Sequence, residues 1–154
     1  MKSLITYNRE VRDEWFEVLN NLSTEELSKE RKSGVGSILR TLFHIIDTEY
    51  SWFRAMYNKN DIQIYFEEFN DLQSIKELSN QYRKEISVFL RQWTPSDENE
   101  VVKPSWMTET YKKGEILRHI IAHEIHHIGQ LSVWSRESEI EPVSSNFIGR
   151  NIKT

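Results

Sequence analysis

The chain has 154 residues, of which 38% are hydrophobic and 29% are charged, and this composition predicts one globular domain over residues 1–154. Its net charge of −4 argues against nucleic acid as the main partner, because binding to phosphate groups needs a basic surface. The sequence contains no cysteine, which excludes disulfides, cysteine-ligated zinc, iron–sulfur clusters and a cysteine nucleophile.

Glycine and proline are both missing between Ser37 and Thr94, and this predicts an all-α fold, because helix interiors exclude both residues. Apolar residues recur at helical spacing in four long segments, and a short helical turn capped by Ser23 follows the first of them. We expect these four helices at about residues 3–21, 37–57, 71–93 and 115–137.

The number and length of these helices predict the architecture. Four amphipathic helices of about 20 residues, joined by two long connections, fit a four-helix bundle with a crossover. Residues 95–114 are expected to be a polar connection, and the tail at residues 142–154 has no assignment. Periodicity alone leaves the relative directions of the helices open.

Four of the five histidines lie in the last expected helix, and two of them are spaced to share a metal ion. On a helical wheel, His123 and His127 fall in the middle of the apolar stripe, four residues apart, so both imidazoles reach one ion. Burying two imidazoles without partners is costly, and a shared metal ion removes that cost. The alternative is a pair of core histidines held by hydrogen bonds. His119 falls at the edge of the stripe, and His126 falls on the outer face.

A zinc-type site needs at least a third protein ligand, and His44 is the one histidine outside this helix. His44 lies about 100° from the apolar stripe of its own helix, on a face of small and polar residues. That face consists of Ser37, Thr41, Thr48, Ser51 and Ala55. It suits the lining of a cavity and equally suits contact with solvent, and periodicity does not choose between the two.

Residues 123–127 also match H-E-x-x-H, the metalloprotease signature in which Glu124 would be the general base. The extended form of that signature needs another histidine downstream, and no histidine follows His127. We therefore expect that the protein is not a protease. Glu124 remains a candidate catalytic residue that orients a ligand or moves a proton, and its simpler interpretation is a supporting or surface carboxylate.

Two segments together resemble the DinB family. One is residues 44–52, where acidic and aromatic residues follow a histidine, and the other is the final helix, whose residues 123–130 read H-x-x-x-H-x-G-Q. The resemblance extends over about residues 4–134, and it implies an up-down-down-up four-helix bundle with one divalent metal ion bound by three histidines. The ligands that it implies in this sequence are His44, His123 and His127.

The resemblance also implies an activity. Similar proteins include bacillithiol S-transferases and mycothiol-dependent isomerases and transferases, in which the metal helps to activate a low-molecular-weight thiol. We therefore expect a metal-dependent thiol S-transferase that takes a small-molecule substrate and a thiol such as bacillithiol, with zinc or nickel as the ion. The alternatives are a hydrolase that uses metal-bound water and a non-catalytic metal-binding stress protein.

The remaining expectations concern coordination, partners and location. Three histidines on one ion leave a position for water or substrate, which is the pattern of catalytic sites. The resemblance allows a homodimer, and the acidic chain predicts no nucleic-acid partner. No uncharged apolar run approaches the roughly 18 residues of a membrane span, and the N-terminus lacks the apolar core of a signal peptide, so we expect a cytoplasmic protein without a membrane partner.

Overall fold

The computed structural model describes residues 1–152, and its helices confirm the predicted all-α bundle. The bundle is formed by the four long helices α1 (Lys2–Leu19), α3 (Ile38–Met56), α4 (Leu72–Gln92) and α5 (Lys113–Glu137). The shorter elements are α2 (Thr24–Ser28), two 3₁₀ turns at Phe66–Glu68 and Pro95–Asn99, and strands β1 (Val101–Val102) and β2 (Tyr111–Lys112).

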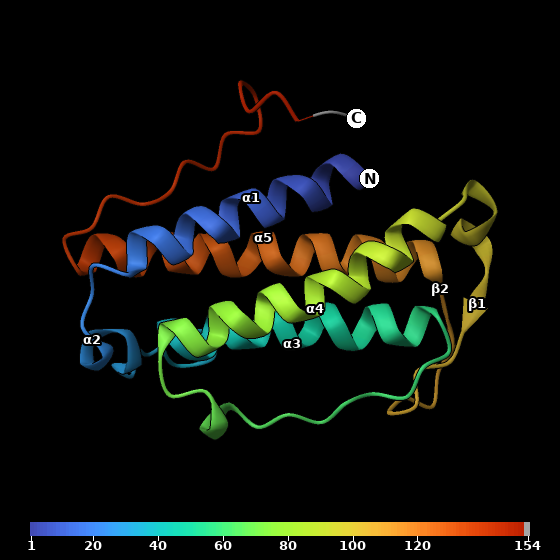
Figure 1. Cartoon of the computed structure of the whole chain (residues 1–154), viewed down its shortest axis with the longest axis horizontal. Coiled ribbons are helices and arrows are strands. Elements are labelled where there is room, and N and C mark those ends of the chain that lie inside the picture. The colour runs from blue at the N-terminus through green and yellow to red at the C-terminus, as the bar shows by residue number, and fades with distance from the viewer. Residues whose placement is uncertain (153–154) are drawn as a thin grey trace.

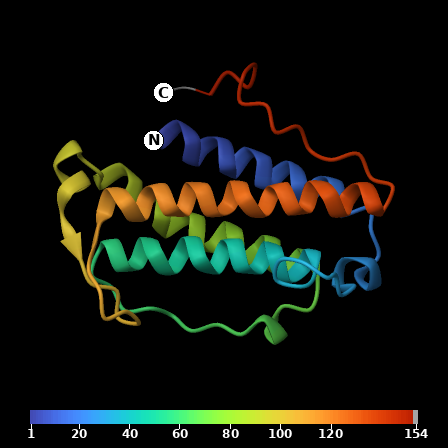
Figure 2. The same cartoon turned by 180° about the vertical axis from the view of Figure 1, so that it is seen from behind.

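The directions of the four long helices, which periodicity left open, follow the up-down-down-up order. Helices α1 and α5 run in one direction, and α3 and α4 run in the opposite direction (Figure 1). Because α3 and α4 are parallel, the chain between them returns along the length of the bundle, and this segment, residues 57–71, is the crossover (Figures 1 and 2). Helix α3 packs against both α4 and α5.

Side-chain caps explain where the helices begin. The hydroxyl of Ser37 accepts a hydrogen bond from the backbone N–H of Arg40, and Asp71 caps α4 in the same way. Helix α5 begins at Lys113, two residues before the expected start. There the carboxylate of Glu115 accepts the backbone N–H of Lys112 over 2.9 Å, as in a capping box, and this contact fixes the earlier start.

The core is one cluster of apolar side chains between the four helices, and it contains a set of buried charges. Trp15 and Trp134 belong to this core, whereas Trp52 and Trp93 are only partly buried against it. Arg12, at 1% exposure, lies among these apolar side chains. A buried charge of this kind needs partners, which are described below with the site.

The connection predicted for residues 95–114 is more structured than expected. Strand β1 pairs antiparallel with β2, with Val101 opposite Lys112, and the side chain of Val102 is buried. Two-residue strands have no measurable alternation, so the pattern of apolar residues could not predict them. The strand pair leads the chain directly into α5.

The C-terminal tail, which had no assignment, runs back along α1 as an extended strap (Figure 1). Tyr7 donates its hydroxyl to the backbone oxygen of Ser145 over 2.6 Å, and Arg150 pairs with Glu14. Val143, within the strap, is buried and belongs to the apolar core. No helix within residues 1–152 is long and apolar enough to cross a membrane.

Candidate metal centre

The structure brings the three predicted histidines together at the contact between α3 and α5. His123 Nε2 lies 3.0 Å from His44 Nε2 and 3.2 Å from His127 Nε2, and one ligand nitrogen from each residue lies within 4.8 Å of the others. His123 and His127 are one turn apart on α5, and His44 faces them from α3. The predicted residues therefore converge on one point from two helices.

The three nitrogens cannot satisfy one another by hydrogen bonding alone. His127 Nδ1 donates to Gln130 Oε1 over 2.8 Å, so the proton of a neutral His127 is on Nδ1 and its Nε2 carries a lone pair. His123 Nε2 faces both other nitrogens, and it holds at most one proton. At least one of the three nitrogens is therefore left without a partner inside the cluster. A divalent cation would accept all three lone pairs.

The spacing of the nitrogens also fits a shared ion. Three nitrogens about 2.1 Å from one ion lie roughly 3.0–3.4 Å apart at coordination angles of about 90–110°. His123 Nε2 lies within this range of both other nitrogens, at 3.0 and 3.2 Å, and the ligand nitrogens of His44 and His127 lie within 4.8 Å of each other. Imidazole nitrogens suit zinc, nickel, copper and iron alike, so the donor set is that of a transition metal rather than of calcium or magnesium.

Burial keeps the three imidazoles unprotonated at neutral pH. Burial, with smaller contributions from the neighbouring histidines, of which His127 and His44 are the largest, lowers the pKa of His123 to about 3. Burial is also the main cause of the lowered pKa of His44 and of His127. Because a metal ligand must present a lone pair, these lowered pKa values prepare the cluster for coordination.

The position of the histidines on α5 differs from the expected one. The buried face of this helix is centred on Glu124, which is 2% exposed, and His123 is half-buried at its edge. The helical wheel located the stripe from its apolar members alone, and so it missed a buried carboxylate at the centre. A position at the edge keeps the cluster close to solvent.

The face of α3 around His44 lies against the rest of the protein. Thr41 and Ala55 are buried, and Thr41 donates its hydroxyl to the backbone oxygen of Ser37 over 2.7 Å. Small side chains on this face allow α3 and α5 to approach closely. Of the two interpretations that periodicity left open, the solvent-exposed face is therefore wrong for these positions.

Glu124, the candidate catalytic residue, is held by Arg12 in the core. The Nε and Nη2 atoms of Arg12 each donate to a different oxygen of Glu124 over 2.7 Å, and its Nη1 lies 2.8 Å from Glu49. Burial alone would lower the pKa of Arg12, but the two carboxylates outweigh burial and raise that pKa. The surface interpretation of Glu124 is therefore wrong, and the proton-transfer role stays a prediction.

Sequence reasoning missed Arg12, although a signal for it exists. Arg12 falls on the same helical face as Asn8 and Trp15, and Glu49 falls within the apolar stripe of α3. An arginine and a glutamate on the inward faces of two helices predict an ion pair, because an isolated buried charge is too costly.

The other two histidines lie outside the cluster of three. His126 is exposed, as expected for the outer face of α5, and its ring centroid is 5.2 Å from that of His127. His119 is also exposed, and its ring contacts Trp52 and His123. Neither residue belongs to the group that can hold an ion.

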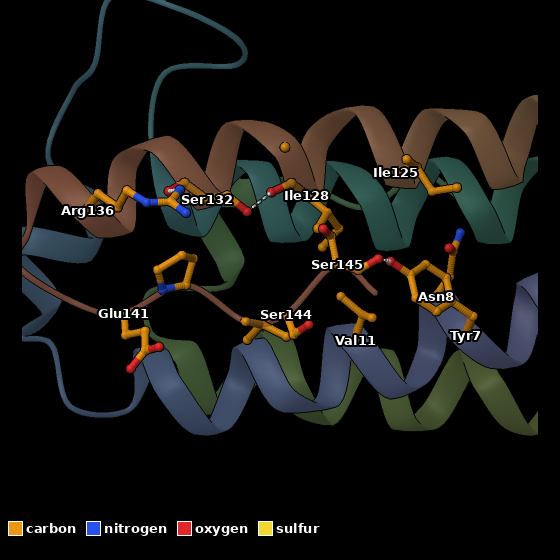
Figure 3. A pocket seen from close by; sticks show the side chains of 13 residues that line it. Tyr7, Asn8, Val11, Ile125, Ile128, Ser132, Arg136, Glu141, Ser144 and Ser145 are labelled. Carbon is orange, nitrogen blue, oxygen red and sulfur yellow. Dashed lines mark hydrogen bonds between the residues drawn. The ribbon is translucent and has the colours of Figure 1, made fainter. Parts of the chain in front are cut away.

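A cavity of about 780 Å³, larger than any that adjoins the histidines among those found in residues 1–152, lies on a different face of α5. It is bounded by α1, α5 and the C-terminal strap, and Val11, Ile128 and Ser145 all line it (Figure 3). None of the three clustered histidines is among its lining residues. Cavity size therefore does not locate the candidate metal centre.

Comparison with known proteins identifies the family of this chain. The model of the DinB family matches residues 1–149. The chain belongs to the DinB family. It is 51% identical over 154 residues to the uncharacterized protein YizA of Bacillus subtilis (strain 168), and the match covers 99% of this chain and 97% of that protein.

A solved structure supports the fold of this DinB protein. The crystal structure of a DinB-like protein from Bacillus cereus ATCC 10987 has 22% sequence identity and a TM-score of 0.66, and the match covers 92% of each chain. At this identity the likeness concerns the fold alone. Within the DinB bundle, both oxygens of Glu124 are bonded to Arg12, which favours the expectation that the H-E-x-x-H match does not indicate a protease.

Proposed function

We propose that this DinB protein is a metal-dependent S-transferase that joins a low-molecular-weight thiol, such as bacillithiol, to a small electrophile. One observation carries the proposal. The Nε2 atoms of His44, His123 and His127 converge on one point where two of the three rings are only half-buried. Three histidine ligands beside solvent are typical of catalytic sites, which keep a position for substrate.

The chemistry needs a thiol from outside, because the chain has no cysteine. In the transfer, the thiol S–H bond and the bond from carbon to the leaving group break, a carbon–sulfur bond forms, and the proton departs with the leaving group. Zinc or nickel bound by the three histidines would lower the pKa of a coordinated thiol and so supply the nucleophilic thiolate.

The remaining contribution of the chain is orientation. Gln130 keeps a proton on His127 Nδ1 and so directs the Nε2 lone pair toward the other two rings. Gly34 lies against Gln130 with φ +64°, and a Cβ at that position would be 2.7 Å from Gln130 Oε1. The glycine therefore permits the loop before α3 to pack on the residue that orients His127.

The test combines elemental analysis with a conjugation assay. We expect about one divalent ion per chain in the purified protein, lost in His44→Ala and retained in His126→Ala, the matched histidine outside the cluster. The loaded protein should join bacillithiol or glutathione to an epoxide above background, and a chelator should abolish this reaction.

Two results would contradict the proposal. The first is full metal occupancy in His44→Ala, which would remove this residue from the site. The second is a loaded protein that conjugates none of the thiols and whose cobalt-substituted spectrum does not change when thiols are added. Chelator-sensitive ester hydrolysis without any thiol would then favour the hydrolase alternative.

A further inference from the structure

A second, smaller cavity lies beside the histidine cluster, where α3, α5 and the connection before α5 meet. Its volume is about 300 Å³. The residues that line it are Trp52, Met107, Tyr111, Glu115, Ile116 and His119. Most of this lining is aromatic or apolar, and the volume lies at the small end of the range for ligand sites, which suits one substituted ring.

The aromatic side chains around this cavity form a packed set centred on Trp52. The ring of Trp52 lies 5.4 Å from that of Trp106, 5.9 Å from that of Tyr111 and 5.5 Å from that of His119, with interplanar angles between 71° and 87°. Edge-to-face contacts at these distances are favourable and fix the ring orientations. The cavity therefore has walls that present ring faces and edges to a ligand.

The cavity adjoins the candidate metal centre through His119. This residue lines the cavity, and its ring centroid is 5.7 Å from that of His123, one helical turn further along α5. A molecule with one end in the cavity therefore has its other end within one or two helical turns of the three histidines. That span matches a small substrate with a reactive carbon and a separate ring.

The charges around the cavity disfavour an anionic ligand. Glu115 is the one acidic residue in the lining, and no lysine or arginine is among the six lining residues. The nearby cations on α5 are already paired, Lys113 with Glu100 over 2.5 Å and Arg118 with Glu98. A carboxylate or phosphate in this cavity would meet the charge of Glu115, and no lysine or arginine in the lining would compensate it.

We infer that this cavity binds the uncharged aromatic group of the electrophilic substrate and so selects which electrophiles reach the histidine cluster. The inference rests on the proposed function for the reacting end of the substrate. Binding of the aromatic end, in contrast, depends only on the cavity and is measurable without metal or thiol.

The binding test uses 4-fluorobenzyl alcohol as the probe and fluorine NMR as the readout, on chelator-treated protein. We expect Trp106→Ala to weaken binding by about 3- to 10-fold, because it removes the ring that packs edge-to-face on Trp52 and holds this lining residue in place. Trp106 is 40% exposed, so the fold should tolerate the change. Tyr65→Ala, at another exposed aromatic residue that neither lines the cavity nor packs on Trp52, is the matched control and should bind the probe like the unchanged protein.

Charge selection is tested with 4-fluorobenzoate on the same metal-free protein. We expect the benzoate to bind about fivefold more weakly than the alcohol, and Glu115→Gln to remove most of that difference. The amide oxygen of glutamine can still accept the N–H of Lys112, so this variant preserves the helix cap. Equal binding of the two probes, or equal effects of Trp106→Ala and Tyr65→Ala, would overturn the inference.

A kinetic arm separates this inference from the proposed function. In the conjugation assay, Trp106→Ala should raise the KM for styrene oxide about 3- to 10-fold and leave the KM for propylene oxide, which has no ring, unchanged. If Trp106→Ala leaves conjugation unchanged, the proposed transferase activity stands and the role inferred for the cavity is rejected. Probe binding without any conjugation would reject the transferase and, with it, the substrate role inferred for the cavity.

Discussion

Helices α3 and α5 each contribute to two polar clusters. The clusters differ in whether their own members provide partners for all the polar groups that they bury. In the core, Arg12 binds Glu124 and Glu49 at 2.7–2.8 Å, so opposite charges compensate each other. At the edge of the same helices, three imidazoles present nitrogens of one kind. Glu124 directly follows His123 in the sequence, yet the two residues belong to different clusters.

The difference shows how the two kinds of site can be told apart. A closed cluster of opposite charges holds elements together, and here it joins α1, α3 and α5 through three buried side chains. In an open cluster of equivalent nitrogens, at least one nitrogen has no partner within the cluster, and a ligand from outside can bind there. Burial alone does not separate them, since His127 is nearly as buried as Glu49.

The largest expected effect tests the closed cluster. Arg12→Met should lower the free energy of unfolding by about 3–5 kcal/mol, because it removes the cation that is bonded to two buried carboxylates. Urea denaturation of the metal-free protein measures this loss. Arg83→Met is the control, since Arg83 pairs with the half-exposed Asp13 and its loss should cost at most about 1 kcal/mol. Similar losses of unfolding free energy in both variants would mean that the core cluster stabilises the protein no more than an ordinary surface ion pair does.

The second prediction tests whether the open cluster needs a ligand. Zinc at about 100 times its dissociation constant should raise the free energy of unfolding by about 2.7 kcal/mol. His123→Ala should abolish this increase, and His126→Ala should keep it, because only His123 belongs to the cluster. Denaturation curves with and without zinc measure the effect. An equal zinc effect in both variants would place the ion elsewhere.

The third prediction sharpens the role of the residue that supports the open cluster. Gln130→Ala removes the acceptor for His127 Nδ1–H, and metal affinity should fall about 10- to 100-fold, which is roughly 1.4–2.7 kcal/mol. Competition with a chromophoric chelator measures the affinity. Ser132→Ala, two residues further along α5, should leave it unchanged. A smaller effect for Gln130→Ala than for the serine variant would contradict the supporting role.

The sequence predicted the bundle and the histidine cluster because both depend on spacing. Helical periodicity and the caps Ser37 and Asp71 determine where the helices lie, and the spacing of His123 and His127 determines that the two rings meet. The place of His44 in the cluster rested more on the family resemblance than on its spacing, since its own helix face was also consistent with solvent. The structure decided that question by showing the packing of α3 on α5.

What could not be predicted depends on contacts between distant segments. Arg12 and Glu124 are 112 positions apart, and periodicity describes one helix at a time. The helical wheel of α5 located the stripe from its apolar residues alone, so it placed the stripe too close to the histidines. The aromatic cavity likewise needs Trp52 from α3 and Tyr111 from β2, which only the tertiary fold brings together.

The smallest expected effect concerns Asp47, which lies on α3 between His44 and Glu49 and faces a charge of its own sign. Burial, with a further contribution from Asp61 on the crossover, raises the pKa of Asp47 to about 6. Asp61 Oδ1 is buried without a hydrogen-bond partner among the described residues. Tyr82, the titratable group that faces this pair from α4, has a pKa raised to about 12 and stays neutral below pH 8. This pair is therefore neither compensated like the ionic cluster nor suited to bind a ligand like the histidines.

The sign of the effect follows from the raised pKa. Below the ordinary pKa of 3.8 the carboxyl of Asp47 is protonated in the folded and unfolded states, and its stabilising contribution is lost as the pH rises through about 6. Asp47→Asn should therefore raise the free energy of unfolding by about 1 kcal/mol more at pH 7.5 than at pH 4.5, allowing for partial solvent screening. Asp61→Asn should give part of the same pH-dependent gain, because it removes the like charge. Urea denaturation of metal-free protein at the two pH values measures both variants. If the gain in unfolding free energy for Asp47→Asn does not change with pH, Asp47 is ionised in the folded state at both pH 4.5 and pH 7.5.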